Sequence, residues 1–184
     1  AARGSDALMH TIAINIQGSP LVADVYPAAG PSAEPPVLLI HGWGGSGRYW
    51  HGTAERLRAH SDVIVPDLPG VGRSLPARRA FDMEAHVAAL ETLLAQLHIP
   101  RVRLVGHSMG GGIAILLAAR RPELVDRLVL TAISLFRNDA ERTFFRAITA
   151  KEIRTRLLGL GLGKTAAVRC AFRDFIHNLL FLRL

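Results

Sequence analysis

The sequence is poor in the features that mark secreted and membrane proteins. Its one cysteine, Cys170, permits no internal disulfide, so a reducing compartment is favoured and we expect a cytoplasmic location. No run of eighteen or more apolar residues occurs, so we expect no membrane span. With 49% hydrophobic and 20% charged residues, the 184-residue chain has the composition of one well-buried globular domain rather than of a disordered segment.

Acidic residues are too few to balance the arginines and lysines, which leaves a net charge of +7. Residues 1–136 hold 12 basic and 11 acidic side chains, whereas residues 137–184 hold 10 basic and 4 acidic ones. The excess positive charge therefore lies mostly in residues 137–184, which we call the tail. Because neither interleaved aromatic residues nor a zinc-ligand spacing accompanies it, we interpret it as solvated helix faces and expect no nucleic-acid partner.

The most informative stretch is VRLVGHSMGG at residues 102–111. An apolar run ends at Gly106 and a helix-forming run begins after the glycines, which places Ser108 on a sharp turn between a strand and a helix. Gly-x-Ser-x-Gly in this setting is typical of a nucleophile elbow, whose strained serine points its hydroxyl away from the sheet. The N–H of Met109 is then predicted to face a developing oxyanion. The alternative is a chance match in a loose glycine-rich loop.

A second glycine-rich loop, HGWGGS at residues 41–46, follows the continuous apolar run Val37 to Ile40. Such a run predicts a strand buried on both faces of a parallel sheet. Glycines at the end of that strand let backbone N–H groups approach a ligand, so the Trp43 N–H is predicted as a second oxyanion donor. An ordinary flexible turn is the alternative. His41 is expected to brace the loop rather than to act as a base.

The remaining patterns predict an α/β fold with a doubly wound, mostly parallel sheet and an N-terminal antiparallel hairpin. The hairpin is expected from residues 9–17 and 21–26, with its turn at Gly18 to Pro20. Asp82 is the expected cap of a helix over residues 81–97. The other expected elements are a short helix around residues 50–57, buried strands at 62–66 and 127–133, and a helix over 109–119.

Together with DLPGVGRS at residues 67–74, the two loops resemble the α/β hydrolase fold family, in its cofactor-free serine hydrolase branch. The resemblance covers about residues 37–133. It implies that Ser108 is the nucleophile, that Trp43 and Met109 supply the oxyanion hole, and that Asp67 orders a loop instead of joining the triad. It also implies a small-molecule ester or related acyl substrate, with no cofactor and no metal.

Residues 137–184 form a second expected segment of basic amphipathic helices, which resembles the start of the family's lid. The family carries its triad acid and histidine after two further strands, which this sequence lacks, so we expect an N-terminal portion of the fold, incomplete at its C-terminus. His177 is the only histidine after Ser108. Its apolar, helix-like surroundings favour a lid or core residue over a triad base. The acids that could accompany it are Asp139, Glu141, Glu152 and Asp174.

Two functional hypotheses follow from these observations. The first is a serine hydrolase acting on an ester or related acyl substrate. The second is a non-catalytic remnant or binding module that keeps the pocket without the base. Related motifs also serve carbon–carbon bond cleavage and peracid formation, so reaction type and substrate identity stay open. We further expect self-association through an exposed sheet edge at residues 127–133.

Overall fold

The computed structural model describes residues 9–133, 140, 141 and 143 of the chain. The chain divides into two compact units, Ala1–Ile133 and Ser134–Leu184, and the first unit contains the sheet. The predicted boundary after residue 136 stays a prediction. The predicted tail helices, lid and His177 lie outside the described residues, as do Asp139, Glu152 and Asp174.

The N-terminal hairpin pairs β1 (His10–Ile16) with β2 (Ser19–Tyr26) in antiparallel orientation, as predicted. Its turn lies at Gln17 and Gly18, so the prediction of a turn at Gly18 to Pro20 was wrong. Both turn residues have positive φ, 51° and 84°, which is the conformation that matches the twist of two hairpin strands. The Asn15 side chain accepts a 2.6 Å hydrogen bond from the Gly18 N–H and stabilises this turn.

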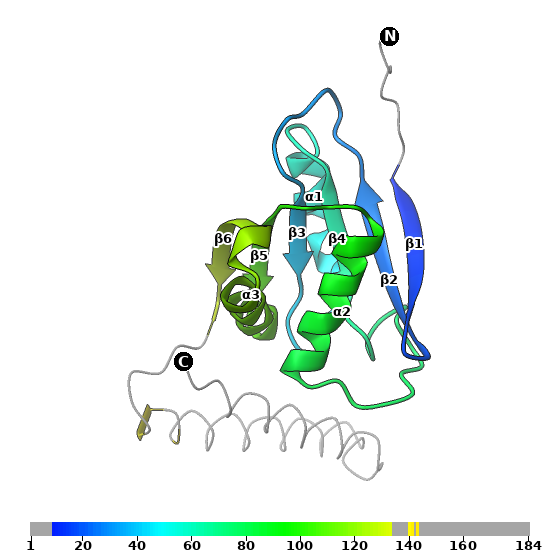
Figure 1. Ribbon diagram of the computed structural model, residues 1–184, viewed down its shortest axis with the longest axis vertical. Coiled ribbons are helices and arrows are strands. Elements are labelled where there is room, and N and C mark those ends of the chain that lie inside the picture. Colours follow the sequence, from blue (N-terminus) through cyan, green and yellow to red (C-terminus); the bar gives the residue numbers. More distant parts are fainter. Residues whose placement is uncertain (1–8, 134–139, 142, 144–184) are drawn as a thin grey trace. The chain divides into compact units, whose positions relative to one another are not determined.

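The sheet has six strands in the order β1-β2-β4-β3-β5-β6 (Figure 1). Its centre is β3 (Val37–Ile40), which pairs in parallel with β4 (Val63–Asp67) and with β5 (Val102–His107). β6 (Val125–Thr131) continues the parallel part beyond β5, whereas β2 joins β4 in antiparallel orientation. The mostly parallel sheet with its antiparallel hairpin is the predicted fold class.

Helices cover both faces of the sheet. The 3-10 helix η1 (Gly47–Trp50) and α1 (His51–Leu57) pack on the face formed by alternate residues such as Leu39 and Val65. α2 (Met83–Gln96) and α3 (Met109–Arg120) pack side by side on the opposite face (Figure 1). The Asp82 carboxylate accepts a 2.8 Å hydrogen bond from the Ala85 N–H, which confirms the predicted cap of α2.

The last strand differs from its prediction. The 3-10 helix η2 (Pro122–Leu124) leads into β6, which starts at Val125 and ends at Thr131 instead of spanning 127–133 as a buried strand. Leu128 is 37% and Val129 is 50% exposed, because β6 is the edge of the described sheet, whereas all four residues of β3 are buried. Self-association through this edge stays a prediction. In the part of the chain that the structure describes, no helix has the length and apolar character to cross a membrane.

Candidate active site

Ser108 lies at the turn between β5 and α3, where the sequence predicts it. Its backbone has φ 54° and ψ −119°, a conformation that non-glycine residues adopt only when the surrounding structure enforces it. Two backbone bonds enforce it here: the Ser108 N–H donates to the Thr131 carbonyl at 3.0 Å, and the Ser108 carbonyl accepts from the Gly111 N–H at 2.9 Å. Ser108 is thereby held just beyond the end of β5, which stops at His107.

The turn is possible because glycines let backbone segments approach closely. A Cβ atom on Gly106 would lie 2.5 Å from the Gly110 carbonyl oxygen, and one on Gly110 would lie 2.4 Å from the Ile40 carbonyl oxygen. Real Cβ atoms essentially never come within 3.0 Å of other heavy atoms. The first turn of α3 is therefore held against both the end of β3 and the end of β5.

The loop after β3 lies beside Ser108. A Cβ atom on Gly42 would be 3.0 Å from the Cβ of Ser108, so the Gly42 backbone is in contact distance of the serine. Trp43 follows directly and is 38% exposed. Met109 is the first residue of α3, and its N–H has no acceptor within the helix. Ser108, Met109 and the peptide that joins Gly42 to Trp43 therefore lie next to one another in the structure.

His41 braces this loop, as predicted. The imidazole is fully buried, and its Nε2 accepts a 2.9 Å hydrogen bond from the Leu68 N–H. The proton must then be on Nδ1, which lies 2.8 Å from the Gly42 carbonyl oxygen and donates to it. Burial lowers the pKa of His41, so the ring stays neutral and both nitrogens serve structural bonds.

Tyr49 makes contacts with Gly42 and His107 that the sequence did not predict. Its hydroxyl accepts a 2.6 Å hydrogen bond from the Gly42 N–H and lies 3.1 Å from Nδ1 of His107. The rings of Tyr49 and His107 meet edge to face, with centroids 5.6 Å apart. Tyr49 and His107 are 58 residues apart, so no local pattern indicates the contact.

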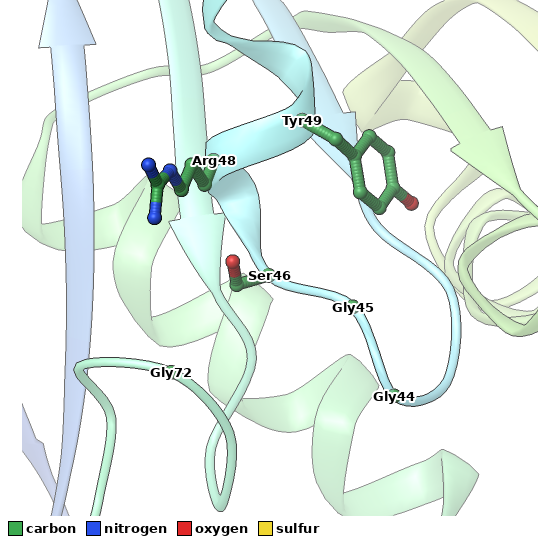
Figure 2. A pocket seen from close by; sticks show the side chains of 6 residues that line it. All are labelled: Gly44, Gly45, Ser46, Arg48, Tyr49 and Gly72. Carbon is green, nitrogen blue, oxygen red and sulfur yellow. The ribbon is translucent and has the colours of Figure 1, made fainter.

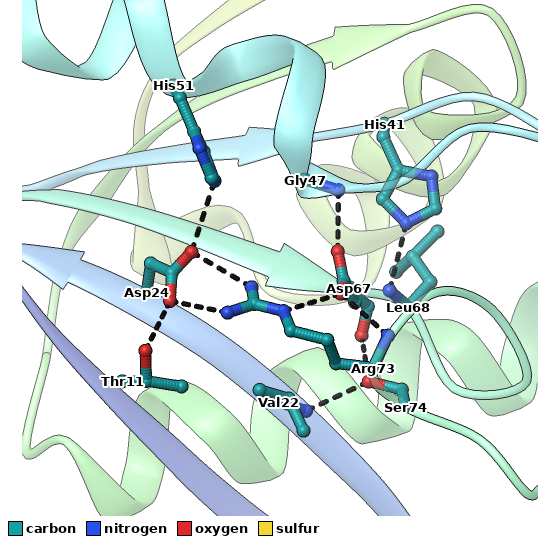
Figure 3. Close-up of polar contacts among 10 residues, drawn as sticks. All are labelled: Thr11, Val22, Asp24, His41, Gly47, His51, Asp67, Leu68, Arg73 and Ser74. Atoms are coloured by element: carbon teal, nitrogen blue, oxygen red, sulfur yellow. Dashed lines mark hydrogen bonds and ion pairs between the residues drawn. The ribbon is translucent and has the colours of Figure 1, made fainter.

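Asp67 orders the surrounding loops, in agreement with the role implied by the resemblance (Figure 3). Its buried carboxylate accepts hydrogen bonds from the Gly47 N–H at 2.6 Å, and from the N–H and Nε of Arg73 at 2.9 and 3.0 Å. Burial by itself raises the pKa of Asp67, but the bonds from Arg73 and Gly47 outweigh it and lower the pKa below its ordinary value. Asp67 is therefore an ionised anchor for the start of η1.

The same arginine extends the network to the hairpin, which the sequence did not predict. The Arg73 guanidinium makes a two-pronged pair with the buried Asp24 carboxylate, at 2.8 and 2.9 Å. Asp24 also accepts from the Thr11 hydroxyl at 2.7 Å and lies 3.1 Å from Nε2 of His51. β1, β2, α1 and the loop after β4 are joined by this one cluster (Figure 3).

A shallow depression of about 630 Å³ borders the glycine-rich loop (Figure 2). Its lining residues are Gly44, Gly45, Ser46, Arg48, Tyr49 and Gly72. The Arg48 and Tyr49 side chains leave η1 in opposite directions, and Ser108 is not part of the lining. Within the described residues, no group of three or more His, Cys, Asp or Glu side chains is placed to hold a metal ion.

The chain is similar to known proteins of one fold family. The sequence profile of the α/β hydrolase fold matches residues 35–161. The chain is 36% identical over 155 residues to a pimeloyl-[acyl-carrier protein] methyl ester esterase of Neisseria meningitidis, covering 84% of this chain and 55% of that protein. It is 45% identical over 101 residues to the lipase LipV of Mycobacterium tuberculosis, covering 55% of this chain and 38% of the lipase.

Solved structures of α/β hydrolases have a similar fold. The crystal structure of an α/β hydrolase from Novosphingobium aromaticivorans superposes with a TM-score of 0.67 at 27% identity, covering 77% of this chain and 50% of that one. The chain spans about half or less of the length of the curated relatives named above. With a matching profile over more than half of its residues, the chain belongs to the α/β hydrolase fold family.

Proposed function

We propose that the protein is a serine hydrolase that cleaves an ester or related acyl bond of a small molecule, with Ser108 as the nucleophile. The observation that carries this proposal is the strained backbone of Ser108, φ 54°, at a strand-to-helix turn with the Gly42 backbone packed beside it. A serine has no structural need for this conformation, and backbone strain of this kind is concentrated at functional sites. The names of the matched relatives, a lipase and a methyl ester esterase, support the same class of reaction.

In the proposed reaction the Ser108 Oγ attacks the carbonyl carbon of the substrate while a general base takes the hydroxyl proton. The carbonyl oxygen becomes an oxyanion, which accepts hydrogen bonds from the N–H groups of Met109 and Trp43. Collapse of the tetrahedral intermediate breaks the bond to the alkoxy group, which leaves as an alcohol with the transferred proton. Water then attacks the acyl-serine by the same route, releases the acid and restores Ser108.

The general base does not come from the histidines that lie nearest the loop. Both ring nitrogens of His41 are used in structural bonds, and Nδ1 of His107 is engaged by Tyr49. In this family the chain order is serine, acid, histidine, so the base follows Ser108 in the sequence. We therefore propose that it comes from the part of the protein outside the described residues, and we retain His177 as a lid or core residue.

The alternative hypothesis, a non-catalytic remnant or binding module, has less support. The matched relatives named above are both enzymes of ester hydrolysis by name. The close contacts around Gly106 and Gly110 would also be unnecessary in a module that does not need an exposed serine hydroxyl. We therefore favour the hydrolase.

Turnover of a chromogenic ester by the purified full-length protein, including the part that supplies the general base, tests the proposal. Ser108→Ala is expected to lower kcat by at least roughly 10³-fold, since loss of the serine in a serine protease costs on the order of 10⁶. Thr53→Ala is the matched control, because Thr53 is an exposed hydroxyl residue of α1 away from the glycine-rich loop, and it should retain wild-type turnover. A Ser108→Ala protein as active as the control would contradict the proposal.

A further inference from the structure

The Tyr49 hydroxyl connects the glycine-rich loop to the strand that carries Ser108. A backbone N–H can only donate, so in the 2.6 Å contact the Tyr49 oxygen accepts from Gly42. The hydroxyl hydrogen is then available to Nδ1 of His107, 3.1 Å away, in the tautomer of that ring that carries its proton on Nε2. Two successive hydrogen bonds therefore join the loop to the residue directly before Ser108.

The tyrosine ring is held in position by its neighbours. A Cβ atom on Gly45 would lie 2.7 Å from Cε1 of Tyr49, so only a glycine lets the ring pack there. The ring also contacts Trp50, with centroids 5.2 Å apart, and meets His107 edge to face. Burial raises the pKa of Tyr49, so its hydroxyl keeps the proton that it donates to His107 at neutral pH.

These contacts determine how the loop presents its amides. The carbonyl of Gly42 and the N–H of Trp43 belong to one planar peptide unit and point in opposite directions. That carbonyl accepts from Nδ1 of His41 at 2.8 Å and from the Gly45 N–H at 3.2 Å. The preceding peptide unit ends in the Gly42 N–H, which Tyr49 holds. With both units fixed, the direction of the Trp43 N–H is fixed too.

We propose that Tyr49 is a positioning residue, which holds the peptide units on either side of Gly42 so that the Trp43 N–H is aimed at the oxyanion formed at Ser108. This inference rests on the proposed hydrolase function. Tyr49 touches no reacting atom, and its contribution comes from pre-organising a donor that acts chiefly in the transition state. Its loss should therefore reduce kcat much more than it changes KM.

Tyr49→Phe tests this because it keeps the ring and removes the hydroxyl. We expect kcat for a chromogenic ester to fall roughly 10- to 100-fold, less than the 10²- to 10³-fold cost of deleting an oxyanion donor outright. KM should change by less than about threefold, because ground-state binding does not use the oxyanion contact. Labelling of Ser108 by a fluorophosphonate should still reach completion, at a lower rate.

Tyr26→Phe is the matched control, since Tyr26 is the only other tyrosine of the chain. It pairs with Val63 in the sheet and packs near His51, in the hairpin half of the sheet. It should leave kcat and KM at wild-type values. Circular dichroism would verify that both variants are folded. If Tyr49→Phe does not fold, His107→Gln removes the second bond of the link, and its kcat is measured instead.

Each outcome decides the question. A wild-type kcat in a folded Tyr49→Phe protein, or a raised KM at unchanged kcat, overturns the positioning role while the proposed function stands. If Tyr49→Phe does not fold, an unchanged kcat in His107→Gln overturns the role in the same way. Wild-type protein that neither turns over ester nor reacts with the fluorophosphonate rejects the proposed function itself. A selective loss of kcat together with complete labelling of Ser108 supports both.

Discussion

The loop that runs from Gly42 to Trp50 has two flanks that are built in different ways. On the side of Ser108, the contacts are backbone against backbone, and they depend on glycines such as Gly106 and Gly110. On the side of the hairpin, the contacts are made by charged side chains, with Arg73 between Asp24 and Asp67. We call these the glycine flank and the charge flank.

The two flanks serve different purposes: the glycine flank fixes the positions of backbone atoms, and the charge flank joins segments that are distant in the sequence. Backbone contacts at the glycine flank leave no room for a side chain to adjust, which suits a site where atoms must stay in register. The charge flank joins segments far apart in the sequence, such as Asp24 and Arg73, 49 residues apart, through long side chains. Because the Arg73 side chain is 44% exposed, water can hydrogen-bond to its guanidinium if one of its carboxylate partners is removed.

Gly110→Ala should have the largest effect on stability. Its Cβ would meet the carbonyl oxygens of Ile40 and His41 at 2.4 and 2.5 Å, and backbone atoms cannot move aside as a flexible side chain can. We expect the free energy of unfolding to fall by roughly 3 kcal/mol, measured by urea denaturation, with ester turnover lost.

Gly52→Ala is the matched control for this change. Gly52 lies in α1, and a Cβ atom there would have no neighbour within 4 Å. Alanine is the better helix former, so the control should be stabilised by up to about 1 kcal/mol. Equal stability of the two variants would show that the glycine flank is not constrained as we describe.

Asp67→Asn breaks the charge flank and should have the next largest effect. It removes the negative charge that accepts three hydrogen bonds from Gly47 and Arg73. Breaking a buried pair costs about 3–5 kcal/mol, and the exposure of Arg73 reduces our expectation to roughly 2–3 kcal/mol. Thermal or urea unfolding measures the change.

Asp126→Asn removes a carboxylate of similar charge from a more exposed pair, 2.9 Å from the Arg101 guanidinium. Pairs of this kind contribute at most about 1 kcal/mol, so this control should unfold nearly like the wild type. A loss at Asp126 that matched the loss at Asp67 would remove the distinction between an anchoring network and ordinary surface charges.

Mild acid should act on the buried histidines, while the carboxylates of the charge flank stay ionised. His86 of α2 is buried against Phe81, its Nδ1 has no hydrogen-bond partner among the described residues, and burial lowers its pKa to about 4. In the unfolded chain this histidine has an ordinary pKa near 6.5, so between about pH 6.5 and pH 4 it binds a proton that the folded protein does not bind. The contribution of His86 to the free energy of unfolding is fully present above about pH 6.5. It decreases by about 2 kcal/mol as the pH falls from 8 to 5.

The buried His41 adds to this dependence with the same sign, because its pKa is also lowered. The carboxylates of Asp24 and Asp67 have lowered pKa values and stay ionised through this range. His86→Phe should flatten the pH dependence of the urea midpoint, whereas His10→Gln, at an exposed position, should not. A midpoint of wild-type protein that does not change from pH 8 to pH 5 would contradict the account.

Local patterns in the sequence were enough to predict most of the fold. The hairpin, the buried β3 and the strand–turn–helix around Ser108 follow from periodicity and glycine placement within a few residues. The hairpin turn was misplaced because Gln17 has a positive φ, 51°, a conformation that is uncommon for a residue other than glycine. β6 was wrongly predicted as buried, since composition does not reveal that its Leu128 and Val129 lie at a sheet edge.

Side-chain pairing across the sheet could not be predicted in the same way. The order β2-β4-β3-β5 brings Asp24 near Arg73 and Tyr49 near His107, and no local periodicity records that order. Ser108, Met109 and Trp43 could be predicted because they lie within recognisable motifs. Tyr49 and Asp24 could not be predicted, because their roles depend on partners that are distant in the chain.

The most direct test of the central claim is to locate the residue that reacts with a fluorophosphonate. Trypsin should release residues 104–120 as one peptide, in which Ser108 is the only serine, so mass spectrometry can assign the adduct without ambiguity. We predict a stoichiometric adduct on this peptide, absent from Ser108→Ala. An adduct on a different residue, or no adduct on the wild-type protein, would contradict the assignment of Ser108 as the nucleophile.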